Sequence, residues 1–246
     1  MTRTQIEIKT ESGVCPANVF KPAGTGPFPA LLFFIDGIGM RPAMHEMGDK
    51  MAAHGYYVLQ PDLFYRAGAY QSPDPTKLFT DPEVGKAWFG KMFGAAAVPG
   101  IMTDTVAFLA HFDAQQDVKK GKVGITGYCM GGRLAMIAAE HYPDRIGAIA
   151  AYHPGGLVTD QPDSPHLAVA KITAKVFVGG AADDANFSDA ARATLDKALA
   201  DAGVAHTVEL FHAKHGWVPS DTPVHDKAEC ERHYQTLFAL LDSTIR

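Results

Sequence analysis

The sequence predicts a single α/β domain built around a mostly parallel β-sheet. Short apolar runs typical of buried strands alternate with helical patterns along most of the 246 residues. Parallel strands need a crossover between them, and the alternating order supplies helices for it, so we expect helices on both faces of the sheet. A chain of this length buries a core of ordinary size, and we expect one domain over residues 1–246.

The first elements can be placed from their residues. QIEIK at 5–9 alternates and VCPANVF at 14–20 follows a polar turn, so the chain is expected to open with an N-terminal hairpin. ALLFFI at 30–35 is continuous and apolar, as in a strand buried on both faces. Pro42 and Gly55 mark the start and end of a helix. The later expected elements are, in order, helix 42–54, strand 56–60, helix 100–116, strand 122–127, helix 130–141, strand 146–152, strand 174–179, helix 188–202, strand 206–211 and helix 223–243.

Residues 62–99 interrupt this alternation. The segment combines several prolines with large aromatic residues, and we expect a lid-like excursion with short helices. Long connections of this kind often form lids or binding loops in compact domains. Trp88, Phe89 and Phe93 are expected either to line an apolar pocket or to pack within the lid itself.

Composition excludes several classes of protein. The net charge of −5 and the lack of a basic stripe argue against nucleic-acid binding. The three cysteines share no short spacing, so neither a disulfide framework nor a zinc site is expected, and reduced thiols in the cytoplasm fit better. No apolar run reaches the length of a membrane helix, and the first residues lack the apolar core of a signal peptide. We therefore expect a cytoplasmic monomer or small homo-oligomer with no metal, no cofactor, no nucleic-acid partner and no membrane partner.

The stretch GYCMG at 127–131 carries the strongest chemical signal. It has the form G-x-C-x-G and lies between the predicted strand KVGIT and the predicted helix RLAMIAAEHY, which is the setting of a nucleophile elbow. The turn is tight, and its neighbours must lack side chains for it to close. The N-terminus of the following helix stabilises negative charge on the sulfur. Cys129 is therefore predicted as a nucleophile, with a buried packing thiol as the alternative.

A nucleophile of this kind needs a base and a group that orients the base. His215 directly follows the predicted strand TVELF. Asp183 and Asp184 both follow the strand before it, at the same edge of the sheet. The order nucleophile, acid, histidine fits this type of fold, and the spacing alone leaves both aspartates as candidates.

Together these motifs resemble the dienelactone hydrolase family, a cysteine-using branch of the α/β-hydrolases. The resemblance runs from about residue 6 to the C-terminus and rests on GYCMGG, PDLF at 61–64, FFIDGIGM and the late HGW. It implies the α/β-hydrolase fold, Cys129 as nucleophile, His215 as base and an aspartate that orients it. Asp184 is favoured because the acid of that family is commonly followed within three residues by an aromatic residue, here Phe187.

The resemblance also implies roles around the nucleophile. Asp36 stands at the position of the family's loop glutamate, which modulates the thiol, although its side chain is one methylene shorter. The backbone N–H groups of Gly37 and Met130 would form the oxyanion hole. The family's substrate-binding arginine four residues after the histidine is replaced here by Pro219.

The expected function is hydrolysis of a small ester or dienelactone-like lactone through a Cys-His-Asp triad and a thioester acyl-enzyme, as in a carboxylic ester hydrolase. Thioesterase activity is also compatible with these residues. The competing function outside the enzymes is a non-catalytic ligand-binding or regulatory protein of the same fold. A nucleotide-binding oxidoreductase is disfavoured, because TGYCMGG comes after several strands and no tyrosine has lysine four residues later. His153 is expected either to border the pocket or to be a turn residue. Arg41 and Arg66 are expected to be solvated, with contact to an anionic substrate as the alternative.

Overall fold

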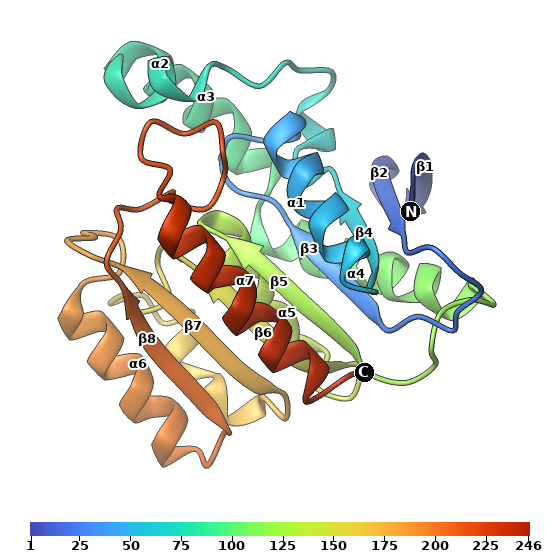
Figure 1. The fold of residues 1–246 in the computed structure, drawn as a ribbon. Helices are drawn as coiled ribbons and strands as arrows, with labels where there is room; N and C mark the ends of the chain where they lie inside the picture. The colour runs from blue at the N-terminus through green and yellow to red at the C-terminus, as the bar shows by residue number, and fades with distance from the viewer.

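The computed structural model describes residues 1–246 and is built on one eight-stranded sheet (Figure 1). The strand order is β1-β2-β4-β3-β5-β6-β7-β8. The β1–β2 and β2–β4 pairs are antiparallel and every other pair is parallel, so the expected hairpin and mostly parallel sheet are confirmed. The strands are β1 (Thr2–Thr10), β2 (Gly13–Lys21), β3 (Ala30–Phe34), β4 (Tyr57–Pro61), β5 (Val123–Tyr128), β6 (Ile146–Tyr152), β7 (Lys175–Ala181) and β8 (His206–Phe211).

Helices cover both faces of this sheet, as expected for the α/β-hydrolase fold. In Figure 1, α1 and α7 lie in front of the sheet and α4 and α5 lie behind it. The α-helices are α1 (Pro42–Ala53), α2 (Pro75–Thr80), α3 (Pro82–Ala95), α4 (Val98–Ala114), α5 (Met130–His141), α6 (Asp189–Asp201) and α7 (Lys227–Asp242). No single helix has the length and apolar composition to cross a membrane, and only α3 and α4 joined across a 56° bend meet that test.

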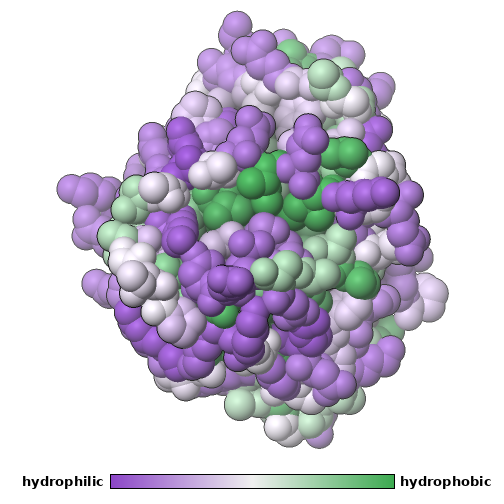
Figure 2. Space-filling model, turned by 90° about the vertical axis from the view of Figure 1, so that its right-hand side faces the viewer, coloured by the Kyte–Doolittle hydropathy of each residue, from purple (hydrophilic) through white to green (hydrophobic).

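The central strands form the core of the molecule. Every residue of β3 and of β5 is buried, in agreement with the continuous apolar runs in their sequences. Figure 2 shows one face of the surface, where hydrophobic residues gather in a hollow that hydrophilic residues surround.

The C-terminal helix begins later than the sequence predicts. α7 starts at Lys227 rather than at residue 223, because the Asp226 side chain accepts a hydrogen bond from the Glu229 N–H (2.9 Å) and caps the helix there. The residues from the end of β8 to Asp226 therefore form one loop. His215 lies on this loop.

The excursion at 62–99 contains the expected short helices: a 3₁₀ turn at Tyr65–Ala67, α2 and α3. Asp74 caps α2 and Asp81 caps α3 through their side chains. Figure 1 shows both helices above the end of the sheet at which β5 finishes. The excursion thus covers the edge of the sheet where ligands bind in open α/β folds. That it acts as a lid stays a prediction.

Candidate active site

Cys129 occupies the turn between β5 and α5 in a strained backbone conformation. Its backbone φ is +53°, a value that residues other than glycine rarely adopt. Its N–H donates to the Tyr152 carbonyl (3.0 Å). A Cβ added at Gly127 would lie 2.1 Å from the Gly131 carbonyl oxygen, and one added at Gly131 would lie 2.3 Å from the Ile35 carbonyl oxygen. The steric reason expected for the G-x-C-x-G spacing is therefore confirmed.

The structure brings Asp184, and not Asp183, to His215. His215 Nδ1 and Asp184 Oδ2 lie 2.7 Å apart, and because an ionised carboxylate only accepts, Nδ1–H donates. The Asp184 side chain is almost fully buried, and its second oxygen accepts from the N–H and Nδ2 of Asn186 (2.8 and 3.1 Å). Asp183 is exposed and forms no ion pair.

The electrostatics of this pair favour a protonated imidazole. Burial opposes the charge on His215, but its hydrogen bond to Asp184 and the adjacent Cys129 thiol raise the pKa of His215 to about 10. Burial also opposes the charge on Asp184, but its bonds from His215 and Asn186 lower the pKa of Asp184 below its usual range. The three residues predicted from the sequence therefore lie in contact as sulfur, imidazole and carboxylate.

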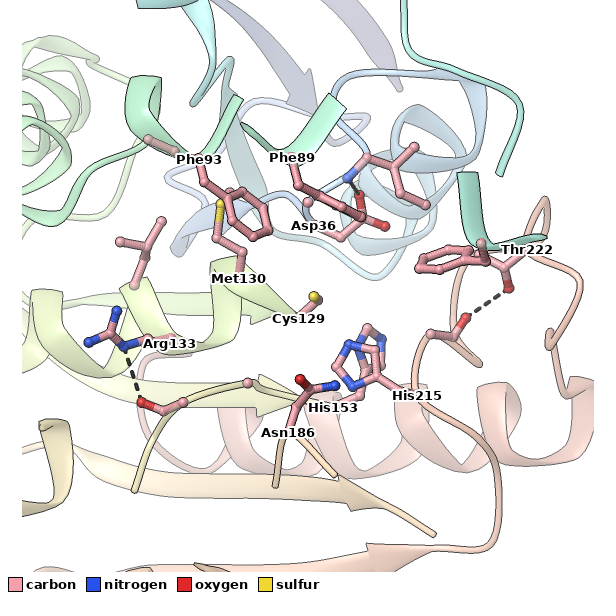
Figure 3. Close-up of a pocket in the computed structure, with 18 of the residues that line it drawn as sticks. Asp36, Phe89, Phe93, Cys129, Met130, Arg133, His153, Asn186, His215 and Thr222 are labelled. Carbon is pink, nitrogen blue, oxygen red and sulfur yellow. Dashed lines mark hydrogen bonds between the residues drawn. The ribbon is translucent and has the colours of Figure 1, made fainter. Parts of the chain in front are cut away.

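A cavity of about 570 Å³ opens beside Cys129. Phe89 and Phe93 of α3 line it from the opposite side to Cys129, with Leu134 and Val98 as further apolar wall (Figure 3). Phe89 and Phe93 thus belong to an apolar pocket, the first of the two alternatives expected for them. An apolar cavity with a few polar groups at one point is typical of a small-molecule site.

The two predicted oxyanion donors are free of protein partners. Neither the N–H of Gly37 nor the N–H of Met130 donates to a protein acceptor, and both residues line the cavity. Trp88 of α3 donates from Nε1 to the Gly37 carbonyl (2.8 Å), and a Cβ at Gly37 would meet Phe93 at 3.2 Å. The excursion therefore packs directly on the loop that carries Gly37.

Asp36 lies at the cavity wall, but its carboxylate is held by Arg41. Arg41 donates to both Asp36 oxygens (2.8 and 2.9 Å) and to Asp221 on the His215 loop (2.7 Å). The expectation that Arg41 is solvated is wrong: it is 6% exposed, because two carboxylates compensate for its loss of water. Arg66 is likewise paired, with the buried Asp104.

Arg133 and Asn186 are cavity residues that the sequence patterns did not reveal as such. The Arg133 Nε donates to the Gly156 carbonyl (3.1 Å), and no carboxylate lies within ion-pair distance of its guanidinium. Its place four residues after Cys129, one turn along the same helix face, is the signal that could have found it. His153 lines the cavity, so the expectation that it borders the pocket is confirmed.

No group of three or more histidine, cysteine or acidic side chains is arranged to hold a metal ion. The polar side chains that line the cavity are those of Asp36, Cys129, Arg133, His153, Asn186, His215 and Thr222.

Comparison with known proteins finds relatives of this chain in one family. The model of the dienelactone hydrolase family matches residues 15–245. A protein of Methylorubrum extorquens provisionally named carboxymethylenebutenolidase is 30% identical over 183 residues, which are 72% of this chain and 59% of that protein. The carboxymethylenebutenolidase of Pseudomonas putida is 31% identical over 130 residues, which are 52% of each chain. The chain thus spans little more than half the length of these relatives.

The fold has a close match among solved structures. A protein of Klebsiella pneumoniae, provisionally called a dienelactone hydrolase, superimposes with a TM-score of 0.84 over 98% of both chains at 18% identity. The family model matches nearly the whole chain and the fold is shared, so the chain belongs to the dienelactone hydrolase family.

Proposed function

We propose that this protein hydrolyses a small carboxylic ester or lactone, with Cys129 as nucleophile, His215 as base and Asp184 as the group that orients His215. The observation that carries the proposal is the strained elbow that presents Cys129 to the cavity beside the His215–Asp184 pair. Membership of the family and relatives named carboxymethylenebutenolidase support lactones as the substrate class.

In the first step, the Cys129 thiolate attacks the carbonyl carbon of the substrate. The oxyanion that forms accepts hydrogen bonds from the N–H groups of Gly37 and Met130. The C–O bond then breaks, and the departing alkoxide takes a proton from the His215 imidazolium. A thioester on Cys129 and a neutral His215 result. With a lactone the alcohol stays tethered to the acyl group, so the second step must outrun ring closure.

In the second step, water attacks the thioester carbon while His215 accepts a proton from it. The C–S bond breaks, Cys129 leaves as thiolate and the carboxylic acid product departs. Asp184 holds the Nδ1–H of His215 throughout and stabilises its positive charge.

Arg133 is expected to favour substrates that carry a carboxylate. Arg133 lines the cavity one helical turn from Cys129, and its Nε donates to the Gly156 carbonyl rather than to a carboxylate. A hydrogen bond to a charged group contributes about 1.5–3 kcal/mol, so Arg133→Gln is expected to raise KM for a carboxylated ester about tenfold or more. KM for a neutral ester of the same size is the control and is expected to change less than about twofold. Equal changes for both esters would contradict this role.

Asp36 is expected to set the pH at which Cys129 becomes reactive. Asp36→Ala removes a negative charge from the cavity wall and leaves Arg41 paired with Asp221. The pH profile of Cys129 alkylation by iodoacetamide is then expected to move toward lower pH, because a negative charge near the thiolate has been removed. Asp221→Ala, which removes the other carboxylate on Arg41 without touching the cavity lining, should move it less. An unchanged profile in Asp36→Ala would exclude the role.

The proposed function is tested by mixing the protein with 4-nitrophenyl acetate and following nitrophenol release, with the protein mass measured during turnover. A burst stoichiometric with protein and an acetyl adduct are expected, and a panel of lactones with and without carboxylates then identifies the substrate. Absence of both burst and adduct, together with binding of a lactone without turnover, would favour the alternative of a ligand-binding protein.

A further inference from the structure

His153 lies beside the proposed catalytic residues in an unusual setting. It follows β6 directly and has a φ of +38°. Its backbone N–H donates a hydrogen bond to the Gly179 carbonyl (2.7 Å). Its ring is 1% exposed, lines the same cavity as Cys129 and lies edge to face with the ring of His215, 5.0 Å between centroids (Figure 3). The fold therefore fixes a second imidazole against the first.

The ring nitrogens of His153 have no protein partner. Both Nδ1 and Nε2 are buried and make no hydrogen bond within the protein, although buried polar atoms are nearly always paired. Burial, together with the nearby His215 and His233, holds the pKa of His153 well below its ordinary value, so the ring is neutral. A neutral imidazole offers one N–H donor and one acceptor nitrogen.

Packing does not account for these nitrogens. His153 packs edge to face on His215 and on Trp217 (4.9 Å between centroids), and a phenyl ring would make the same contacts without unpaired polar atoms. The packing of the protein thus leaves the two nitrogens without a partner, and buried polar atoms of this kind are commonly satisfied by an ordered water. Such a molecule needs at least two polar partners at a buried site.

We propose that His153 binds the water that hydrolyses the thioester and holds it against His215. This inference rests on the proposed function. The Nδ1 of His215 is occupied by Asp184, so its Nε2 is the nitrogen that accepts the water proton. The two rings are in contact, and in the proposed arrangement one water bonds to a nitrogen of each. Water is required only in the second step, so His153 acts there and not in the formation of the thioester.

The chemistry of that step balances without any change at His153. The water oxygen forms a bond to the thioester carbon, its proton passes to His215 Nε2, and the C–S bond breaks. Cys129 departs as thiolate and the acyl group as carboxylic acid. His153 contributes a hydrogen bond that fixes the oxygen and neither gains nor loses a proton.

The test separates the two steps with 4-nitrophenyl acetate in rapid mixing. In His153→Phe the burst amplitude and burst rate are expected to stay within about twofold of the native protein, whereas the steady-state rate falls by about tenfold or more. The acetyl adduct should persist correspondingly longer in mass spectra. His153→Asn tolerates positive φ and keeps a shorter hydrogen-bonding side chain, so an intermediate rate is expected.

Four outcomes would overturn the inference. Burst and steady-state rates that fall together would indicate a structural role, and unchanged rates in a folded His153→Phe would indicate none. If thermal unfolding shows that His153→Phe does not fold, His153→Asn decides, and a steady-state rate equal to that of the native protein would reject the inference. A native protein that forms no adduct and turns over neither this ester nor a lactone would reject the proposed function itself and this inference with it.

Discussion

Cys129→Ala is expected to abolish the burst and the acyl adduct and to lower kcat by about 10³-fold or more. The variant keeps the elbow, because alanine fits wherever a cysteine Cβ fits, but it removes the atom that forms the thioester. The adduct is therefore lost even if the oxyanion donors still bind and polarise the ester. Stopped-flow release of nitrophenol and intact mass measure both effects on one sample.

Cys230→Ala is the matched control for this result. Cys230 lies on α7, donates from Sγ to the Val218 carbonyl (3.4 Å) and does not line the cavity. Its burst and kcat are expected to stay within about twofold of the native values. Equal losses in both variants, or an adduct that survives in Cys129→Ala, would contradict the role of Cys129.

Chemical labelling gives a second check on the same assignment. Burial raises the pKa of Cys15 to about 12 and also raises the pKa of Cys230, so both thiols stay protonated near neutral pH. Iodoacetamide is therefore expected to label Cys129 first. The Cys129→Ala variant lacks that thiol, so it should show little rapid labelling.

The elbow could be predicted from the sequence because its constraints are local. The glycines at 127 and 131 are required by contacts within a few residues and with the neighbouring strand, so the spacing itself reports the geometry. The strand-to-helix order is equally local, and the predicted bounds of α5 and β6 agree with the structure. His215 and the acidic pair could be placed because strand ends of a parallel sheet meet at one edge.

The remaining features depend on contacts between distant segments. Arg41 is buried because Asp36 and Asp221, which are far apart in the sequence, both reach it, and no local pattern carries that information. The bond from Trp88 to Gly37 is of the same kind. Even the choice between Asp183 and Asp184 depends on the turn after β7. There Asp183 takes a φ of +53° and is exposed, whereas Asp184 bonds to His215.

That choice has a direct experimental consequence. Asp184→Asn is expected to lower kcat/KM by about 10²–10⁴-fold, because an amide neither holds the Nδ1–H tautomer of His215 reliably nor stabilises its charge. Asp184 helps to raise the pKa of His215 to about 10, and its loss lowers that pKa. The imidazolium, which protonates the departing alkoxide, then loses its proton at lower pH, so the upper limb of the pH profile of kcat/KM should move to lower pH.

Asp183→Asn provides the control, because it makes the same change of charge one residue away on an exposed side chain. Its kcat/KM is expected to match that of the native protein within about twofold across the pH profile. A loss confined to Asp184→Asn would mean that the buried hydrogen bond to His215 matters and not the acidity of the loop. If Asp183→Asn instead lost activity and Asp184→Asn did not, the loop would have to rearrange during turnover and the roles of the two carboxylates would exchange.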